Sequence, residues 1–317
     1  MKKYTDTGKK DTRSGFGAGL LEAGRKNPDI VALAADLVGS VKMDAFAKEF
    51  PERFIQCGIA EANMIGAAAG LAITGKVAFV GSFAEFVTGR VYDQVRQEVA
   101  YGHTNVKIAS SHAGITLGED GATHQTMEDI ALMRALPGMV VINPCDYNQC
   151  KAATLAIAEY KGPVYLRYGR PAMPNFTPED QVFEIGKAIN FNEGTDVTIF
   201  ATGHLVWEAI NAAEILEAEG ISAEVINIAT IKPLDVEAVV ASAKKTGAVV
   251  CAEEHNMCGG LGELIAGVLA SHAPTPVEYI NGGDRFGQSG TPAQLLKAYD
   301  MDAEHIAEAA RKAIARK

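Results

Sequence analysis

The sequence predicts an α/β protein built from two tandem α/β/α sandwich domains with mostly parallel sheets. Short β-branched runs alternate with alanine-rich stretches of helical length along the whole chain of 317 residues. The β-branched runs are continuously apolar, as is typical of parallel strands that helices cover on both faces. A proline-rich stretch at 170–180 interrupts the alternation, and a chain of this length suggests about two domains.

The first half of the chain contains the predicted strands and helices of one such sandwich. Runs of valine, isoleucine and other apolar residues form the strands, which we expect at 30–33, 77–80, 106–110, 139–142 and 164–167. The stretches between them favour helices, which we expect at 13–26, 61–73, 86–100, 126–135 and 147–160. Because strands and helices alternate, we expect the strands to form a parallel sheet.

The second half repeats the alternation after the stretch at 170–180. Three prolines in this stretch disfavour a helix and suit a linker, so we place the domain boundary near residue 185. The expected domains are therefore 1–184 and 185–317. We expect strands at 197–201, 223–228, 249–252 and 277–280, and helices at 205–218, 236–244 and 261–271.

Charge and composition argue against several classes of protein. The chain has 29 Lys and Arg against 39 Asp and Glu, and the net charge of −10 disfavours nucleic acid as a partner. No run approaches the roughly 20 apolar residues of a membrane span, and no apolar run follows the first basic residues as in a secretory signal. The five cysteines form no CxxC pair, so we expect reduced thiols, a cytoplasmic protein and no metal site in this chain.

The densest polar cluster is the segment 110–125, which follows the end of a predicted strand. It contains two histidines and two carboxylates, His112, Glu119, Asp120 and His124. Ligands of open α/β sheets bind at the carboxyl ends of strands, and such side chains can move protons and bind hydroxyl groups. The structural alternative is a polar surface loop that leads into the helix expected at 126–135.

Three other features allow both a functional and a structural interpretation. Glu61 is expected in the first turn of a helix, where the helix dipole alone explains a carboxylate, and the residues themselves argue against catalysis. Phe83 and Phe86 could hold a flat heterocycle, although pairs at this spacing more often belong to the core. The glycine-rich turn at 259–262 could bind an anion at a helix start, or it could allow tight packing.

Together, these segments resemble the transketolase family, specifically the C-terminal half of such enzymes. The resemblance covers essentially the whole chain, as a pyrimidine-binding domain followed by a transketolase C-terminal domain. Its most specific motifs are LGEDGATHQ at 117–125, CGIAEANM at 57–64 and AEEHNMCGGLG at 252–262. The resemblance implies an enzyme that uses thiamine diphosphate to move a two-carbon ketol unit from a ketose phosphate to an aldose phosphate.

The resemblance also implies which residues contact the cofactor. Glu61 matches the glutamate that hydrogen-bonds N1′ of the aminopyrimidine ring and so promotes removal of the proton at thiazolium C2. Phe83 and Phe86 match the aromatic residues that clasp this ring, and Asp36 matches an acid near the cofactor. A further aromatic residue of many family members is missing after Phe86, so the roles of residues 89–92 stay open.

The implied substrate-binding residues form two groups. Asp120 and His124 match residues that bind substrate hydroxyl groups and help proton movement at the carbonyl. The group expected to hold the sugar phosphate is Arg13, Ser40, His112 and Arg170. Two guanidinium groups, an imidazole and a hydroxyl suit a dianion. Arg167 is the alternative to Arg170, which stands at the family's distance before the Met-Pro pair at 173–174.

The family's diphosphate anchor is missing from this sequence. Thiamine diphosphate enzymes hold Mg²⁺ and the diphosphate with a GDG motif and a later asparagine, and no segment here matches that pattern. The resemblance therefore implies the smaller subunit of a split transketolase, completed by an N-terminal subunit that carries the diphosphate and metal site. An α2β2 assembly is expected, with the small-residue helix face of Ala62, Gly66 and Gly70 as candidate contact.

Other members of the thiamine diphosphate group are the alternatives. Half of an enzyme similar to 1-deoxyxylulose-5-phosphate synthase is favoured slightly by Ala122, and a 2-oxoacid dehydrogenase β subunit is less similar in the loop at 117–125. Glu119, His112 and the spacing of the two phenylalanines favour transketolase. A non-catalytic regulatory subunit would have lost the matched residues, which are all present. The default substrates are xylulose-5-phosphate and ribose-5-phosphate of the pentose phosphate pathway.

Overall fold

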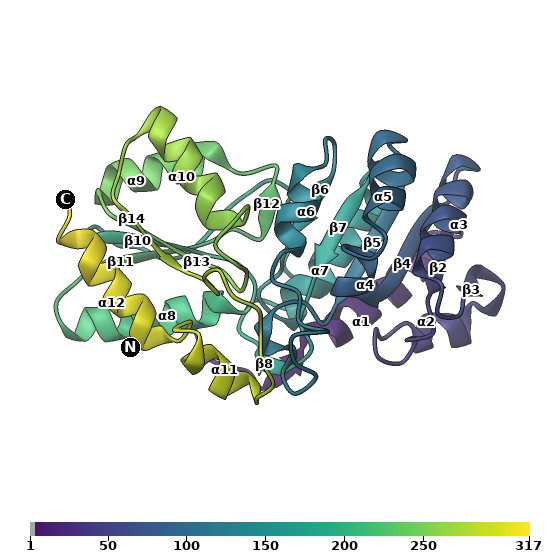
Figure 1. Ribbon diagram of the computed structural model, residues 1–317, viewed down its shortest axis with the longest axis horizontal. Helices are drawn as coiled ribbons and strands as arrows, with labels where there is room; N and C mark the ends of the chain where they lie inside the picture. Colours follow the sequence, from purple (N-terminus) through teal and green to yellow (C-terminus); the bar gives the residue numbers. More distant parts are fainter. Residues whose placement is uncertain (1–3) are drawn as a thin grey trace.

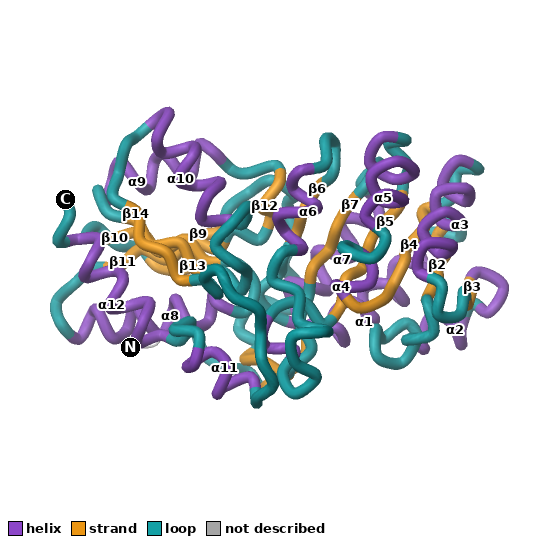
Figure 2. The backbone as a smooth tube through the Cα atoms, viewed as in Figure 1, coloured by secondary structure: helices purple, strands orange, loops and turns teal. Residues whose placement is uncertain are grey.

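The computed structural model describes residues 4–317 as two α/β units that lie side by side along the long axis of the molecule (Figure 1). Their strands form one seven-stranded and one five-stranded sheet, and a small two-stranded sheet accompanies them. The prediction of two tandem, mostly parallel α/β sandwiches is confirmed. In Figure 2, loops gather where the two units meet, between the two groups of strands.

The first unit is built on the seven-stranded sheet, whose order is β12-β6-β7-β5-β4-β2-β3. Apart from β12, the strands of this sheet are all parallel and have the bounds β2 (Ile30–Ala34), β3 (Phe54–Gln56), β4 (Val77–Phe83), β5 (Val106–Ser111), β6 (Val140–Ile142) and β7 (Val164–Arg167). Their apolar side chains alternate between the two faces of the sheet, as the period of a strand requires.

Helices cover both faces of this sheet and so bury the continuous apolar runs of its strands. One face carries α1 (Thr12–Lys26), α2 (Asp44–Glu49) and α7 (Tyr147–Glu159). The other carries α3 (Glu61–Ile73), the π-helix η2 (Val95–Tyr101) and α6 (Asp129–Ala135). Within β2, Ile30 packs with Phe16 of α1, whereas Val31 belongs to the same cluster as Met64 of α3.

The second unit repeats this plan on the five-stranded sheet, whose order is β14-β13-β10-β11-β9. Its strands are β9 (Ile189–Asn192), β10 (Val197–Ala201), β11 (Ala223–Asn227), β13 (Val249–Ala252) and β14 (Val277–Ile280), and only the edge strand β9 is antiparallel. The helices are α8 (Leu205–Ala218) and α12 (Ala303–Ile314) on one face, α9 (Val236–Thr246) and α10 (Leu261–His272) on the other, and α11 (Pro292–Ala298).

Two strand pairings tie distant parts of the chain together. The strand β12 (Thr230–Lys232) comes from the second half of the sequence, yet it pairs antiparallel with β6 and completes the first sheet. Near the amino end, β1 (Lys9–Asp11) pairs with β8 (Ala172–Pro174), inside the stretch expected to be a linker. The boundary near residue 185 stays a prediction, because the chain crosses back to the first sheet after it.

The expected helix at 86–100 is wrong. The chain forms α4 (Ala84–Val87), α5 (Tyr92–Gln94) and then η2, with a break between α4 and α5. The Thr88 hydroxyl donates to the backbone oxygen of Ala84 at 2.6 Å, and Gly89 follows directly. Side-chain hydroxyls that compete for helix carbonyls and a flexible glycine both disfavour continuation of a helix.

The expected helix at 126–135 starts three residues late, at Asp129. The backbone before it is used in tertiary contacts, because Thr126 accepts from Gly114 and Met127 accepts from Asn256 of the second unit. The short elements η1 (Pro51–Arg53) and η3 (Ile115–Leu117) complete the described structure. None of the helices within residues 4–317 has the length and apolar character needed to cross a membrane.

Candidate active site

One edge of the seven-stranded sheet gathers most of the residues singled out from the sequence. β2, β4, β5 and β7 are parallel neighbours, so their carboxyl ends lie side by side. Asp36 follows β2, Phe83 ends β4, His112 follows β5, and Arg170 lies three residues beyond the end of β7. Ligands of open parallel sheets bind at this kind of edge, which is therefore the candidate active site.

The backbone at this edge is strained at two residues. Asp36 and His112 have φ angles of 65° and 63°, in the left-handed region that residues with a side chain seldom adopt. The Asp36 N–H donates to the side-chain oxygen of Gln56 at 2.8 Å, and Ser111 Oγ lies 2.7 Å from Nδ1 of His112. The surrounding structure thus holds both residues in conformations that cost free energy, as is common where side chains face a ligand.

Planar side chains form a row across the site, which we call the aromatic row (His112, Phe83 and Phe86). The His112 and Phe83 rings are stacked with centroids 3.7 Å apart, and Phe83 and Phe86 are stacked at 5.8 Å. His124 meets Phe86 edge-on at 5.5 Å. The outer end of the row is covered by Arg90, whose Cζ lies 3.9 Å from the centroid of the Phe86 ring.

Glu61 lies beside this end of the row. It is the first residue of α3 and only 4% of its surface is exposed. Its Oε1 accepts a hydrogen bond from Nη1 of Arg90 at 3.1 Å. The site therefore combines a buried carboxylate at a helix start with the face of an aromatic ring, and it accepts a planar group with N–H donors, here a guanidinium.

The four residues predicted to hold a phosphate also come together. The pKa of His112 is lowered to about 3, mainly by burial and in smaller part by the nearby charges of Arg13, Arg170 and His124. Arg13 Nη1 donates to the backbone oxygen of Ser40 at 3.1 Å. His112 is therefore neutral at physiological pH and lies near two guanidinium groups, a combination that suits an anion.

The structure separates the two candidate arginines Arg167 and Arg170. Arg167 is buried and pairs with Asp129, with Nε 2.7 Å from Oδ2. The Arg170 side chain is 39% exposed and donates to the backbone oxygen of Leu117 and to Glu119 Oε2, each at 2.9 Å. Of these two groups, Arg170 is the one that a ligand can reach, and its role in phosphate binding stays a prediction.

The loop at 117–125 carries the remaining predicted residues. Asp120 is exposed, like Asp36, and Nδ1 of His124 lies 2.9 Å from Thr123 Oγ1. Gln125 fastens the loop, because its Nε2 lies 3.0–3.1 Å from the backbone oxygens of Ile115, Gly118 and Gln288. Since Gln288 belongs to the second unit, the loop is held from both units.

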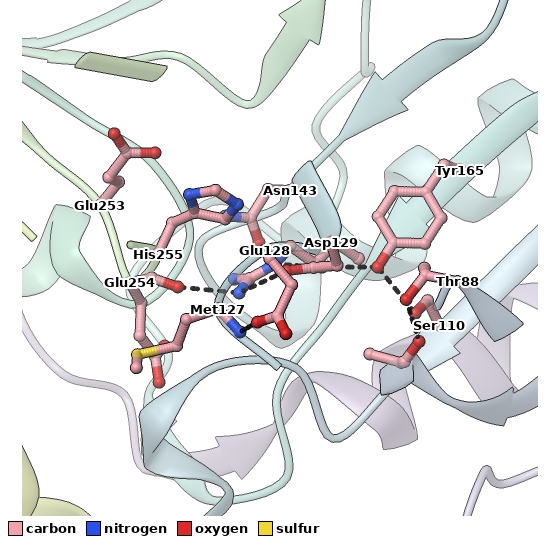
Figure 3. A network of polar contacts seen from close by, with 12 residues as sticks. Thr88, Ser110, Met127, Glu128, Asp129, Asn143, Tyr165, Glu253, Glu254 and His255 are labelled. Atoms are coloured by element: carbon pink, nitrogen blue, oxygen red, sulfur yellow. Dashed lines mark hydrogen bonds and ion pairs between the residues drawn. The ribbon is translucent and has the colours of Figure 1, made fainter. Parts of the chain in front are cut away.

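A buried polar network behind the site was missed by the sequence reasoning (Figure 3). Asp129 pairs with Arg167 and accepts from the Tyr165 hydroxyl, and Arg167 Nη2 donates to the backbone oxygen of Glu254 at 2.8 Å. The Glu254 carboxylate in turn accepts from the backbone N–H of Thr116. The network joins the base of the site loop to the second unit. The motif at 252–262 was the available signal, but a sequence does not show which loop it contacts.

The side chains of His204 and Glu254 of the second unit pack closely against glycines of the first unit. A Cβ atom at Gly169 would lie 2.2 Å from Cε1 of His204, and one at Gly114 would lie 2.5 Å from the Glu254 carboxylate. Burial lowers the pKa of His204 to about 4 and raises that of Glu254. Because Gly169 precedes Arg170, these contacts position the chain that presents Arg170 to the site.

The glycine-rich turn at 259–262 has a structural role. Its helix start receives the protein's own Glu253, whose carboxylate accepts from the N–H groups of Leu261 and Gly262 at 2.6 and 2.8 Å. A Cβ atom at Gly260 would lie 2.2 Å from the same carboxylate. Both tight packing and anion binding thus occur in this turn, with an internal anion.

The described residues fit one end of thiamine diphosphate better than the other. A buried acid beside aromatic faces matches a planar nitrogen heterocycle that shares a hydrogen bond with the acid through a ring nitrogen. For the diphosphate end, no three His, Cys, Asp or Glu side chains within residues 4–317 are grouped so that they could hold a metal ion. The pyrimidine end fits this chain, whereas a metal-bound diphosphate needs donors from elsewhere.

Comparison with protein families gives two matches that together cover most of the chain. Residues 8–175 match the model of the transketolase pyrimidine-binding domain, and residues 186–306 match that of the transketolase C-terminal domain. The candidate active site lies within the first match. The residues of the second unit that contact it, among them His204 and Glu254, lie within the second.

Individual proteins show the same similarity over nearly their full length. A protein of Methanocaldococcus jannaschii, provisionally named as a transketolase C-terminal section, is 50% identical over 94% of this chain and 95% of its own. A 6-deoxy-6-sulfo-D-fructose transketolase subunit of a Clostridium species is 46% identical over 94% and 92%. The solved structure of a split-gene transketolase, an inactive β4 tetramer, has a TM-score of 0.90 and 45% identity, covering 97% of this chain and 99% of its own.

Proposed function

This chain belongs to the transketolase family, and from that premise we propose that it is the C-terminal subunit of a split, thiamine diphosphate-dependent transketolase. It transfers a two-carbon ketol unit from a ketose phosphate to an aldose phosphate. An N-terminal subunit supplies the diphosphate and Mg²⁺ site, and the two subunits assemble as α2β2 in the cytoplasm. We place the domain boundary near residue 185 and the contact with a second chain on the face of α3 that carries Ala62, Gly66 and Gly70.

The observation that carries this proposal is the buried carboxylate of Glu61 at the end of the aromatic row. An acid that is 4% exposed needs a hydrogen-bond partner, and a ring nitrogen of an aminopyrimidine supplies one, because it accepts the proton that the Glu61 carboxyl donates. Thiamine diphosphate, when bound, supplies the carbanion-stabilising centre that ketol transfer requires. Glu61 would hold a proton at its carboxylate near the pyrimidine, and Phe83 and Phe86 would hold the face of the ring.

The substrate side of the site follows from its charges. Arg13 and Arg170 lie near the neutral His112, so a terminal phosphate would receive charge-assisted hydrogen bonds from the first two and an N–H from the third. His124 and Asp120 would bind the hydroxyl groups of the sugar and move protons at its carbonyl. Since a related subunit is named for a sulfonated ketose, the nature of the terminal anion needs a direct test.

Reconstitution tests the proposal. The chain is assayed alone and mixed with a candidate N-terminal subunit, with thiamine diphosphate, Mg²⁺, xylulose-5-phosphate and ribose-5-phosphate. Transfer is expected only in the mixture, and parallel assays with 6-deoxy-6-sulfo-fructose as donor show whether a sulfonate replaces the phosphate. Activity of this chain alone would refute the split site. A mixture that assembles and binds the cofactor but transfers no ketol unit would refute the activity.

A further inference from the structure

Arg90 occupies the place beside Glu61 that the proposed function gives to the aminopyrimidine ring. Its guanidinium lies 3.9 Å from the centroid of Phe86 and donates to Glu61 Oε1 at 3.1 Å. The side chain of Arg90 is 48% exposed, whereas that of Glu61 is 5% exposed. The Arg90 side chain thus extends from the surface and covers the Glu61 carboxylate, which would contact solvent without it.

A guanidinium and an aminopyrimidine place the same demands on this site. Both are flat and both stack on an aromatic face. The guanidinium donates N–H bonds within its plane, and the aminopyrimidine does so from its ring nitrogen once that nitrogen holds the proton it shares with Glu61. The carboxylate has two oxygens, but one ring face cannot stack on both groups at once, so the two groups compete for that face. We propose that Arg90 is a built-in occupant of the pyrimidine position, which fills it in the free subunit and swings out when the cofactor enters. This inference rests on the proposed function.

The chain around Arg90 allows such a movement. Arg90 lies in the break between α4 and α5, directly after Gly89, and not within a helix. Its backbone N–H donates to the backbone oxygen of Glu85 at 3.3 Å. A short, non-helical segment with a glycine is the kind of element that absorbs changes of backbone angle.

Glu85 offers a second acceptor for the released guanidinium. Its Oε1 lies 3.3 Å from the position of a Cβ on Gly89, so the carboxylate is next to the arginine's backbone. Burial raises the pKa of Glu85, the nearby Glu128 raises it further, and Arg90 already acts in the opposite direction. A positive charge near Glu85 therefore stabilises its carboxylate. Moving Arg90 from Glu61 to Glu85 exchanges one ion pair for another.

The two positions of Arg90 give a population shift between a closed and an open site. In the free subunit the closed state fills the acceptor and the ring face, so the buried Glu61 is not left without a donor. When cofactor binds, part of its binding free energy opens the site, which lowers the measured affinity by the fraction of closed molecules. Removing Arg90 therefore strengthens cofactor binding.

Calorimetric titration of thiamine diphosphate into the reconstituted complex, with saturating Mg²⁺, tests this inference. We expect Arg90→Ala to lower the Kd about three- to fivefold, the effect of the cation–π contact with Phe86 that the open state lacks, since the two ion pairs replace each other. Arg90→Met, which keeps an apolar stem but has no donor, is expected to lower it as well. Arg96→Ala is the matched control, because Arg96 is also exposed and lies in the adjoining η2. Its Kd should equal that of the wild type.

A double-mutant cycle tests the second position of the arginine. We expect Glu85→Gln to raise the Kd about two- to threefold in the wild-type background, because the open state loses its ion pair. In the Arg90→Ala background, Glu85→Gln should leave the Kd unchanged. Equal effects in both backgrounds would show that Glu85 acts without Arg90 and would overturn the swing.

The outcomes separate this inference from the proposed function. If wild-type complex does not bind thiamine diphosphate, both are wrong. If it binds, but Arg90→Ala leaves the Kd within twofold of wild type or raises it, the proposed function stands and the built-in occupant is refuted. Size-exclusion chromatography checks that each variant assembles. Because Arg90 is half exposed, its truncation leaves no buried cavity.

Discussion

The carboxyl ends of the two parallel sheets carry similar polar residues and use them in opposite ways. In the first unit, Asp36 is exposed and Arg170 keeps 39% of its side chain open, while His112 between them in the sequence is 3% exposed. In the second unit, β13 is followed by Glu253, Glu254 and His255, whose exposed fractions are 1%, 2% and 0%. The same architecture therefore gives one open edge and one closed edge.

The difference lies in where the hydrogen-bonding partners come from. Glu253 is satisfied by the start of α10, and Glu254 by a backbone N–H of the first unit. At the open edge, Glu61 is satisfied by a surface arginine that can be exchanged. Polar residues at a strand end thus indicate a ligand site only when their partners can be replaced by a ligand, which requires the structure to decide.

The largest expected effect is a difference in kcat between variants of two glutamates, each in the first turn of a helix. Glu61→Gln in the reconstituted complex is expected to lower kcat by about 10²–10⁴-fold, the range for a lost acid–base group. Glu263→Gln, in the first turn of α10, is the matched control and should leave kcat unchanged. Steady-state ketol transfer measures both. A Glu61→Gln complex that keeps wild-type kcat would remove the open edge from catalysis.

The second prediction concerns the stability contributed behind the site. Asp129→Ala leaves Arg167 as an uncompensated buried charge, so we expect the free energy of unfolding to fall by about 3–5 kcal/mol. Asp29→Ala, which breaks an exposed ion pair with Lys76, should have a far smaller effect. Urea denaturation of the free chain compares them. Similar losses for the two variants would contradict a special role for the buried network.

A third prediction tests the anion end of the open edge. Arg170→Ala is expected to lower kcat/KM for ribose-5-phosphate about 10–100-fold, because a charge-assisted bond to the phosphate is lost. For an acceptor aldehyde without phosphate, kcat/KM should change less than about twofold. Competition assays with the two acceptors give the ratio. Equal losses with both acceptors would mean that Arg170 only shapes the loop at 117–125.

The smallest expected effect, taken per pH unit, is a dependence of stability on pH. Folded His112 has a pKa of about 3 against 6.5 for the free side chain, so the unfolded state binds more protons between these values. The free energy of unfolding therefore falls as the pH drops from 6.5 towards 3, by at most about 1.4 kcal/mol per pH unit from this residue.

His112→Asn should flatten this slope, whereas His272→Asn, at the exposed end of α10, should leave it unchanged. Thermal or urea unfolding of the free chain at several pH values provides the measurement. An unchanged slope in the His112 variant would show that the imidazole is not held neutral by the fold.

Much of the fold was predictable because its strands are buried on both faces. The strands at 30–33, 77–80 and 197–201 come close to or match β2, β4 and β10, since continuous apolar runs have few other uses. Short edge strands such as β9 and β12 were missed, because their pairing depends on distant partners. The prediction of one helix at 86–100 was wrong because Thr88 and Gly89 favour a break. The average composition over these fifteen residues does not reveal such a local break.

The site was predictable only in part from the residues themselves. The cluster at 110–125 indicated a ligand loop, but Glu61 was assigned through the family resemblance, since an acid at a helix start has an ordinary structural explanation. The contact of Arg90 with Glu61 spans 29 positions, and that of Glu254 with Thr116 spans 138. Contacts between residues so far apart in the sequence depend on the fold, and the local periodicity of apolar residues does not predict them.

The pairing of β12 with β6 has a consequence for how the chain is made. During synthesis the ribosome releases residues 140–142 long before residues 230–232. The edge strand β6 therefore stays unpaired until β12 has been synthesised. An unpaired parallel edge is a template for association with other chains. We therefore expect a fragment that ends at residue 185 to aggregate. In the complete chain, the pairing of β12 with β6 removes this exposed edge.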